Sequence, residues 1–443
     1  MKLWLTTITA ALCLPLCAVE LKLDNDLAYQ LTDSLTVEVG QRLAGSEADA
    51  RAVAWAEQKF KQLGYDKVWR EPFTMQYWER GQASLQVSAP FHQQLVVTAL
   101  GGSVATPFDG IDAQVVMFDS LEQLKQASAD DVKGKIVFIN KSMAKDKLGS
   151  FYGSVVGARA QGAVEAARLG ASAIIIRSVG TSVNRFAHTG IMRYSDDVAR
   201  IPAAAISVPD AIQLAKMLAL RPELTLKLHM QNKLPGEVIS HNVIAEITGT
   251  ERPDEIVLIG AHLDSWDEGT GALDDGAGVG IVMAAGALLK KQGAPKRTVR
   301  VVLFGNEEGG LVGARAYAAK HAAALEKHVF ASESDFGAGR IWRLDTGFGP
   351  QSQDFAKQLL NKLQPLGIEA GTNTASGGPD VSVLKAQGVP VVSLQQDGTD
   401  YFDYHHTPND TMDKVDPQAM QQNLQAWLTT ISTVANSTAD LRQ

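Results

Sequence analysis

Alternating apolar and amphipathic stretches in the second half of the chain restrict its possible folds most strongly. After His241, short runs of apolar residues such as EIVLIGAH, TVRVVLF and PVVSL are separated by stretches with helical periodicity. Strands that are apolar on both sides are buried on both faces, which is typical of a parallel sheet covered by helices. The pattern therefore predicts an α/β fold with a mainly parallel mixed sheet flanked by helices. In such sheets, binding sites form beyond the carboxyl ends of the strands.

Local signals predict most of the other elements. LAYQLTDSLTVEVGQRL is typical of a first helix, and Ser46 with Asp49 predicts the capped start of a second helix that ends near Gly64. Strand-like runs follow at residues 67–78 and 84–98. In the second half, helices are predicted at residues 276–290, 310–324, 352–366 and 416–435.

The first 18 residues, MKLWLTTITAALCLPLCA, combine an early lysine, an apolar run and a small-residue end. This pattern is typical of a secretory signal peptide, so we expect a secreted or periplasmic protein. Both cysteines, Cys13 and Cys17, lie in this leader, which leaves histidine, aspartate and glutamate as metal ligands in the mature chain. No later segment reaches roughly 18 uninterrupted apolar residues, so we expect no membrane span after cleavage.

A change in the pattern of predicted strands and helices indicates an inserted domain at residues 101–234. Short strand candidates, among them GKIVFIN and SAIIIRS, surround the small-residue helix GARAQGAVEAARLGA. Glycine and proline residues mark both ends of this region, at residues 101–102 and 235–236. We therefore expect a compact insertion with its own core, while residues 19–100 and 235–443 form the catalytic domain.

Histidine and carboxylate residues follow the ends of successive predicted strands. The candidates are His262, Asp264, Asp274, Asp275, Glu307, Glu308, Asp335, His405, His406 and Asp410. Because the carboxyl ends of parallel strands share one edge of a sheet, we expect these side chains to gather there. Imidazole and carboxylate groups together suit Zn²⁺, with Co²⁺ or Mn²⁺ as possible substitutes. Adjacent buried glutamates would otherwise repel each other, so a cation is expected between them.

Each signal also has a simpler interpretation when it is taken alone. A single His-x-Asp is commonly a hydrogen-bonded histidine, and Asp274 and Asp275 before a glycine can form a turn or a helix cap. The two glutamates could end an ordinary exposed strand, and the tandem histidines could lie on the surface. The ten candidate residues lie in five segments, all of which are predicted to meet at one edge of the sheet. This shared position favours the metal site over the separate interpretations.

A glycine-rich stretch suggests one rival, a dinucleotide-binding loop. Gly276, Gly278 and Gly280 follow a predicted strand, but their spacing departs from G-x-G-x-x-G. Asp274 and Asp275 directly precede them and would repel a pyrophosphate at the helix N-terminus. The sequence also lacks H-E-x-x-H and G-x-S-x-G, so single-zinc helix proteases and nucleophile-elbow hydrolases are not indicated.

Five motifs together resemble a known family. They are GAHLDSW, LDDGAG, NEEGGLVGARAY, SESDFG and HHTPNDT. The combination is similar to the di-zinc aminopeptidases and carboxypeptidases of peptidase family M28, and most similar to their carboxypeptidase Q, or plasma glutamate carboxypeptidase, branch. The resemblance covers nearly all of the mature chain and implies a zinc-exopeptidase fold, which is phosphorylase/hydrolase-like. Residues 101–234 resemble the protease-associated (PA) domain insertion of that family.

The resemblance implies two zinc ions per chain, held by five ligands. It assigns His262 and Asp335 to one ion, Glu308 and His406 to the other, and Asp274 to a bridging position. Glu307 corresponds to the general base, which takes a proton from a metal-bridging water. Neighbouring side chains at a strand end point in different directions, so one glutamate can bind metal while the next faces the water.

Three carboxylates are expected to support this centre. Asp264 would orient His262, because imidazole ligands commonly pair with a carboxylate. Asp275 follows the bridging residue, where the family carries a cis peptide, and is expected to be structural. Asp410, four residues after His406, would support the ligand loop.

Two assignments stay open. Spacing favours His406 as the ligand and leaves His405 to stabilise the tetrahedral oxyanion, but a shifted loop register would exchange the two roles. In ASGGPDVSV, Ser376 or the amides of Gly377 and Gly378 could bind a peptide terminus, and the segment could equally be a turn before a helix.

These features predict a secreted di-zinc exopeptidase that hydrolyses dipeptides or short peptides with free termini. One alternative is a non-catalytic receptor or binding protein on the same fold, in which the PA domain carries recognition. Another is an acyltransferase of the glutaminyl cyclase type. The net charge of −8 argues against a nucleic-acid partner, and the resemblance suggests a homodimer.

Overall fold

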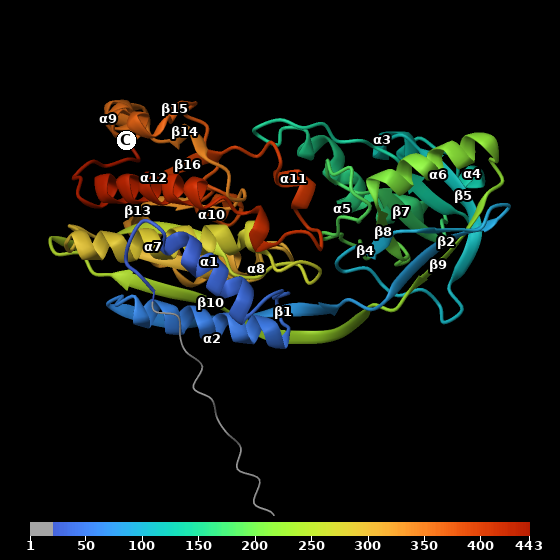
Figure 1. The fold of residues 1–443 in the computed structure, drawn as a ribbon, viewed down its shortest axis with the longest axis horizontal. Helices are drawn as coiled ribbons and strands as arrows, with labels where there is room; N and C mark the ends of the chain where they lie inside the picture. Colours follow the sequence, from blue (N-terminus) through green and yellow to red (C-terminus); the bar gives the residue numbers. More distant parts are fainter. Residues whose placement is uncertain (1–20) are drawn as a thin grey trace, which may run out of the picture.

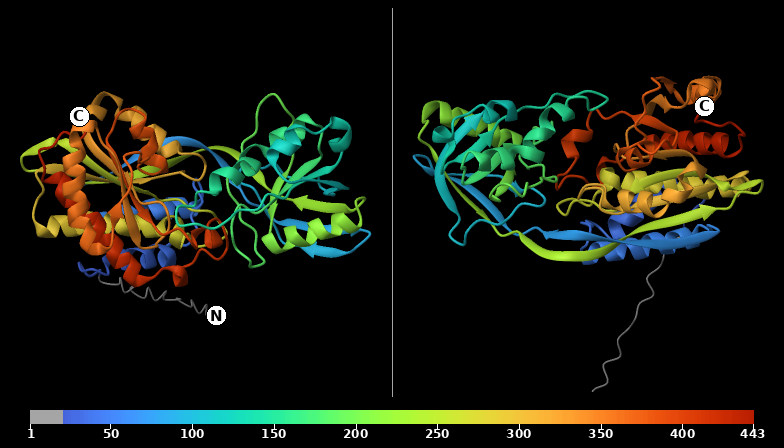
Figure 2. Two further views of the ribbon diagram at one scale, coloured as in Figure 1. Left: turned by 90° about the horizontal axis from the view of Figure 1, so that it is seen from above. Right: turned by 180° about the vertical axis from the view of Figure 1, so that it is seen from behind.

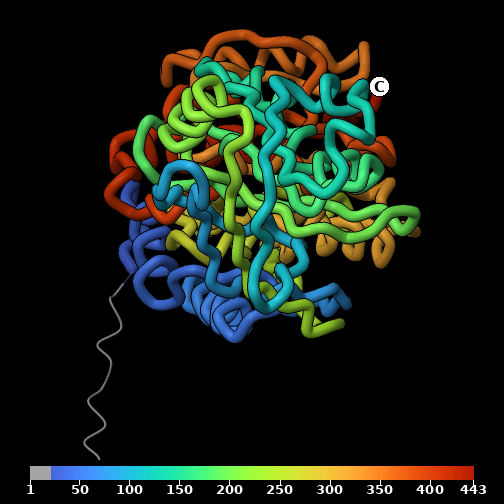
Figure 3. The backbone as a smooth tube through the Cα atoms, turned by 90° about the vertical axis from the view of Figure 1, so that its right-hand side faces the viewer, coloured from blue at the N-terminus to red at the C-terminus, as the bar shows by residue number. Residues whose placement is uncertain are grey.

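The computed structural model describes residues 21–443, so the predicted signal peptide with Cys13 and Cys17 lies outside the described residues. The described chain forms two units that lie side by side along the longest axis of the molecule (Figures 1 and 2). Each unit is built on an eight-stranded sheet. Viewed from the end, the second unit lies in front of the first (Figure 3).

The first unit contains the predicted α/β sheet. Its strands are β1 (Lys67–Glu79), β10 (Lys233–Ile247), β11 (Arg252–His262), β12 (Arg297–Phe304), β13 (His328–Glu333), β14 (Ile341–Gly347), β15 (Glu369–Ala370) and β16 (Val391–Gln396). They follow the order β1-β10-β12-β11-β13-β16-β14-β15. Parallel pairing joins β12, β11, β13 and β16, and also β14 and β15. The pairs β1–β10, β10–β12 and β14–β16 are antiparallel. The predicted mixed sheet is confirmed, and its parallel part forms the centre.

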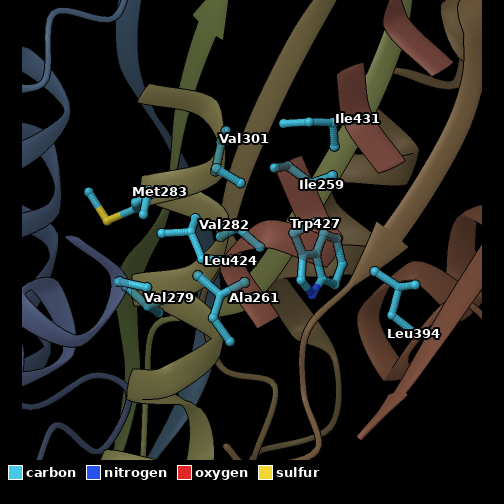
Figure 4. Packing of buried hydrophobic residues seen from close by; sticks show 14 of the residues in the cluster. Ile259, Ala261, Val279, Val282, Met283, Val301, Leu394, Leu424, Trp427 and Ile431 are labelled. Carbon is cyan, nitrogen blue, oxygen red and sulfur yellow. The ribbon is translucent and has the colours of Figure 1, made fainter. Parts of the chain in front are cut away.

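Helices cover both faces of this sheet, as the apolar strands predict. The helices of this unit are α1 (Leu27–Glu38), α2 (Glu47–Gln62), α7 (Ala277–Gln292), α8 (Val312–Lys320), α9 (Gln353–Leu363), α10 (Pro379–Lys385) and α12 (Pro417–Ala435), with the short α11 (Tyr401–Tyr404) at the side that faces the second unit. Ile259 and Ala261 of β11 face α7 and α12 in one core (Figure 4). Leu258, the residue before Ile259 in β11, lies on the other face of the sheet and packs with α8 and α10 in the core there. The alternation of side chains along each strand therefore fills two cores.

The glycine-rich start of α7 is explained by close packing. A Cβ at Gly280 would lie 2.4 Å from the carbonyl oxygen of Ala28 in α1, and a Cβ at Gly278 would lie 2.0 Å from that of Ser334. These glycines therefore let neighbouring backbones approach α7. Within residues 21–443, one helical stretch, Ala272–Gln292, has the length and apolar composition of a membrane span, and its apolar window is fully buried in the core.

The second unit comprises residues 83–230. Its strands are β2 (Ala83–Ala89), β3 (Gln93–Leu95), β4 (Val97–Ala99), β5 (Ile111–Phe118), β6 (Ile136–Ile139), β7 (Ala173–Arg177), β8 (Ala203–Ile206) and β9 (Thr225–Met230). They form the order β3-β2-β9-β5-β6-β7-β8-β4, with helices α3 (Leu121–Lys125), α4 (Ala129–Val132), α5 (Tyr152–Arg168) and α6 (Val208–Leu220) packed on the sheet. The unit includes residues 83–99, which precede the expected insertion boundary at residue 101. Its assignment as a PA domain stays a prediction.

Strands β1 and β10 connect the two units. They stay paired from Lys67 and Glu246 to Glu79 and Lys233, and then lead into β2 and β9. Figure 1 shows this ribbon running from one unit to the other. The second unit is therefore attached through two strands of one continuous antiparallel pair.

Candidate metal centre

The predicted site residues meet at the carboxyl edge of the parallel strands. His262 is the last residue of β11, Glu307 and Glu308 follow β12, and Asp335 follows β13. Asp274 comes from the turn before α7, and the tandem histidines come from the segment after α11. Three overlapping sets of these side chains have ligand atoms within 4.8 Å of one another: Asp274, His405 and His406; His262, Asp275 and Asp335; and His262, Asp274 and Glu308.

Asp274 lies between two groups of ligand atoms. Its Oδ1 is 3.1 Å from His262 Nε2, which is also 3.4 Å from an oxygen of Asp335. Its Oδ2 is 3.3 Å from His406 Nε2, which is 3.0 Å from an oxygen of Glu308. One carboxylate thus offers a different oxygen to each of two histidine-carboxylate pairs.

The two tandem histidines differ in the distances of their ring nitrogens from the neighbouring carboxylates. Their rings stack with centroids 3.5 Å apart. His405 Nε2 lies 3.7 Å from Asp274 Oδ2, a longer approach than that of His406. Of the two histidines, His406 is the one that forms a close pair with Glu308. This geometry places Nε2 of His406 nearer to both carboxylates and leaves His405 facing the same cavity, and the assignment of His406 as the ligand stays a prediction.

The donors and the charge of this cluster suit divalent cations. Asp274 Oδ2 and Glu308 Oε1 are buried and have no hydrogen-bond partner within the described part of the chain. Burial raises the pKa of Glu307 well above its usual range, and the negative charges of Asp335 and Glu308 act in the same direction. So many converging carboxylates need positive charge, and oxygen and imidazole ligands are those that Zn²⁺ accepts.

Asp264 supports the centre differently from the expectation. The partner of His262 Nδ1 is the backbone oxygen of Asp264 at 3.0 Å, whereas the carboxylate is 3.9 Å away. That carboxylate instead accepts a hydrogen bond from the amide of Glu307 at 3.1 Å. Burial raises the pKa of Asp264 to about 7. The carbonyl therefore orients the histidine, and the side chain fixes the backbone of Glu307.

Asp275 and Asp410 hold the backbone around Asp274. The Asp274–Asp275 peptide is cis, and the buried Asp275 carboxylate accepts from the amides of His262 and Gly278, each at 3.1 Å. Asp410 accepts from the amides of Leu273 at 2.6 Å and Asp274 at 3.1 Å, and burial raises its pKa to about 7. Both carboxylates are therefore occupied by backbone donors.

The glycine loop before α10 lies less directly at the centre. Ser376 is exposed, the Gly377 amide donates to Ser393 Oγ at 3.1 Å, and Gly378 packs against Glu333. Of this stretch, Pro379 lines the cavity beside the metal cluster. The substrate-binding role of Ser376, Gly377 and Gly378 stays a prediction.

Two supporting residues were missed by the sequence analysis. Trp266 Nε1 donates to Glu308 Oε2 at 2.6 Å, so the indole holds one oxygen of a candidate ligand. Arg42 is completely buried and donates to the carbonyl oxygens of Leu263, Thr270 and Gly271, which surround the Asp274 turn. These contacts join segments distant in sequence, so neither residue carries a local signal.

Arg42→Met is expected to lower the free energy of unfolding by about 3 kcal/mol or more, because two buried carbonyls and one part-buried carbonyl would lose their donor. Denaturant unfolding followed by tryptophan fluorescence measures the change. Arg51→Met, at an exposed position of α2, is the matched control and should alter stability by less than about 0.5 kcal/mol. An unchanged unfolding midpoint for Arg42→Met would contradict this role.

A cavity of about 410 Å³ opens beside the cluster. Glu307, Asp335 and His405 line one side of it. Tyr152, Arg159 and Arg193 of the second unit also line it. The candidate site is therefore formed between the two units.

Comparisons with known proteins identify the family of this chain. The sequence model of peptidase family M28 matches residues 242–431. Carboxypeptidase Q of Mus musculus is 36% identical over 92% of this chain and 86% of its own length. A peptidase M28 precursor from Shewanella amazonensis has a structure with a TM-score of 0.93 at 52% identity, covering 94% of this chain and 95% of that one.

A zinc aminopeptidase from Bacillus subtilis shares the fold, with a TM-score of 0.70 at 20% identity over 94% of this chain and 96% of that one. The fold and the buried His/Asp/Glu cluster therefore agree with the extensive similarity to carboxypeptidase Q. The chain belongs to peptidase family M28, the zinc exopeptidases, and is carboxypeptidase Q-like.

Proposed function

We propose that this chain is a di-zinc exopeptidase that hydrolyses dipeptides or short peptides with free termini. The observation that carries the proposal is the position of Asp274, whose two oxygens approach His262 and His406 separately at 3.1 and 3.3 Å. A carboxylate shared in this way is the arrangement expected of a bridging ligand in a two-metal site.

The proposed ligands follow from the two groups around Asp274. His262 and Asp335 hold one zinc ion, and Glu308 and His406 hold the other. Co²⁺ or Mn²⁺ can replace zinc at such nitrogen and oxygen ligands. When bound, the ions supply Lewis acidity, which polarises the scissile carbonyl and lowers the pKa of water.

Glu307 moves the proton in the proposed reaction. Its carboxylate lines the cavity and takes a proton from the attacking water, whose oxygen forms a bond to the carbonyl carbon. The same carboxyl then protonates the leaving nitrogen as the C–N bond breaks. His405, whose ring faces the cavity, is placed to donate a hydrogen bond to the developing oxyanion.

The charge of the second unit supports recognition of a free carboxylate. Arg193 is exposed, lines the cavity and forms no ion pair within residues 21–443. A peptide bound with its carbonyl at the metal centre would bring its C-terminal carboxylate within reach of this face. The proposal therefore includes dipeptides, in which the scissile bond lies beside the free carboxylate.

Arg193→Gln is expected to raise KM for unblocked dipeptides about two- to fivefold, the effect of losing one exposed charge pair. Hydrolysis of the corresponding dipeptide amides should change little, because they carry no carboxylate. Steady-state kinetics on both substrate types measures the difference. Arg221→Gln, at an exposed position elsewhere on the second unit, is the control, and equal effects on acids and amides would contradict the assignment.

A dipeptide panel with N-acetylated and C-amidated versions tests the function itself. The zinc-loaded protein is expected to cleave the unblocked dipeptides, and the blocked versions show which terminus it requires. A protein that binds two zinc ions but cleaves nothing in the panel would contradict the proposal. The glutaminyl cyclase-type and non-catalytic alternatives would then be tested with N-terminal glutaminyl peptides and with peptide binding.

A further inference from the structure

A loop of the second unit is hydrogen-bonded to the segment that carries the tandem histidines. Its contacts pair the Thr181 amide with the Phe402 carbonyl at 3.0 Å, the His188 ring with the His405 carbonyl at 2.8 Å, and the Thr189 amide with the His406 carbonyl at 3.0 Å. In Figure 1, α11 lies on the side of the first unit that faces α5. The second unit thus holds the backbone on which a proposed ligand sits.

The backbone of His406 needs this support. Its φ of 61° lies in the left-handed region, which costs a residue with a Cβ roughly 1–2 kcal/mol. Such a conformation persists where the surroundings fix it. The amide of Thr189, which donates to the His406 carbonyl, is one of the groups that fix it.

The ring of His406 has two neighbours at Nδ1 that favour opposite tautomers. The carbonyl oxygen of Thr189 lies 3.3 Å away and can accept a hydrogen bond from a protonated Nδ1, whereas Nη1 of Arg159, also 3.3 Å away, can donate one to an unprotonated Nδ1. A neutral imidazole that binds metal through Nε2 carries its proton on Nδ1. Thr189 therefore favours the metal-binding tautomer, and Arg159 favours the other.

Two observations favour Thr189 as the partner. Thr189 is fully buried, and its carbonyl has no other hydrogen-bond donor among the described residues. Arg159 keeps one partner without His406, because Nη2 donates to the hydroxyl of Tyr152 at 2.6 Å, while its buried Nε has no partner among the described residues in either case. Leaving the carbonyl unpaired would cost about 1–3 kcal/mol.

We propose that the second unit completes the metal centre without supplying a ligand. His188 and Thr189 are positioning residues: His188 fixes the His405 carbonyl, and Thr189 fixes both the backbone of His406 and the proton on its Nδ1. Nε2 of His406 is then held toward Asp274 and Glu308. This inference rests on the proposed di-zinc site.

The test uses His188, whose contact is made by a side chain. His188→Ala removes the hydrogen bond to the His405 carbonyl, and His188→Asn restores a donor near the position of Nδ1. His229→Ala is the matched control, because His229 is a half-buried histidine of the same unit whose Nε2 lies 3.2 Å from the carbonyl oxygen of Phe108. Competition with a chromogenic chelator gives the two zinc dissociation constants of each full-length variant.

In His188→Ala, one zinc dissociation constant is expected to rise about 10- to 100-fold, the effect of removing a group that supports a ligand. The other constant should stay within about twofold, His188→Asn should recover most of the loss, and His229→Ala should match the wild type. Unchanged constants in folded His188→Ala, or no recovery in His188→Asn, would overturn the inference. A wild type that fails to bind two zinc ions would instead overturn the proposed function.

The proton on His406 gives a readout that does not depend on how the His188 variants fold. In the zinc-loaded wild type labelled with ¹⁵N-histidine, the ring signals lost in His406→Gln identify this residue. The expected spectrum shows its proton on Nδ1. A proton on Nε2 in the loaded protein would overturn the role of Thr189.

Discussion

Glu307→Gln is expected to lower kcat for dipeptide hydrolysis about 1,000-fold or more, while the protein keeps both zinc ions. An amide cannot take a proton from the attacking water, and general acid-base groups commonly contribute about 10²- to 10⁴-fold. Metal content should be retained because the proposed ligand positions belong to other residues. Steady-state kinetics and zinc analysis by mass spectrometry measure the two quantities on the same sample.

Glu326→Gln, at an exposed position, makes the same chemical change away from the site and should leave both quantities unchanged. A Glu307→Gln protein that retains kcat within about tenfold of the wild type would show that another group moves the proton. Loss of one zinc ion together with activity would place Glu307 among the ligands instead.

Asp274→Asn is expected to reduce bound zinc from two ions to at most one and to remove measurable hydrolysis. The amide keeps the size of the side chain but offers one neutral oxygen in place of two charged ones. The ion that loses this ligand should bind more than about 100-fold more weakly, beyond the effect of residues that merely support ligands. Chelator competition measures the affinity.

Asp131→Asn, at an exposed position on the second unit, controls for the change of charge. Two zinc ions bound to Asp274→Asn with wild-type affinity would show that the two groups of ligands do not depend on a shared carboxylate. The proposed geometry would then be wrong, whatever the activity.

Much of the catalytic unit could be predicted because its strands have strong local signals. EIVLIGAH and TVRVVLF are largely apolar runs; the first ends in His262, and Glu307 and Glu308 lie shortly after the second, so both the strand and its functional end can be predicted. The helix ends were less predictable. The segment expected as a helix from residue 310 forms α8 only from Val312, because Gly310 and Leu311 adopt φ values of 112° and 60°. Similarly, α1 ends at Glu38, before the end of the stretch predicted as helical.

The groups that support the centre could not be predicted in the same way. Arg42 meets the Asp274 turn, and His188 meets the histidine segment, only after the chain has folded. Asp264 lies two residues after His262, but the sequence cannot show that its carbonyl, rather than its carboxylate, makes the contact. Strand β14 was missed because IWRLDTG mixes polar and apolar residues in the way that an exposed loop also does.

Anomalous diffraction at the zinc edge from crystals of the zinc-loaded protein tests the di-zinc centre most directly. The proposed centre predicts two strong peaks on either side of Asp274, one bound by His262 and Asp335 and the other by Glu308 and His406. A single peak, or two peaks that do not share Asp274, would contradict the di-zinc centre on which the proposed reaction depends.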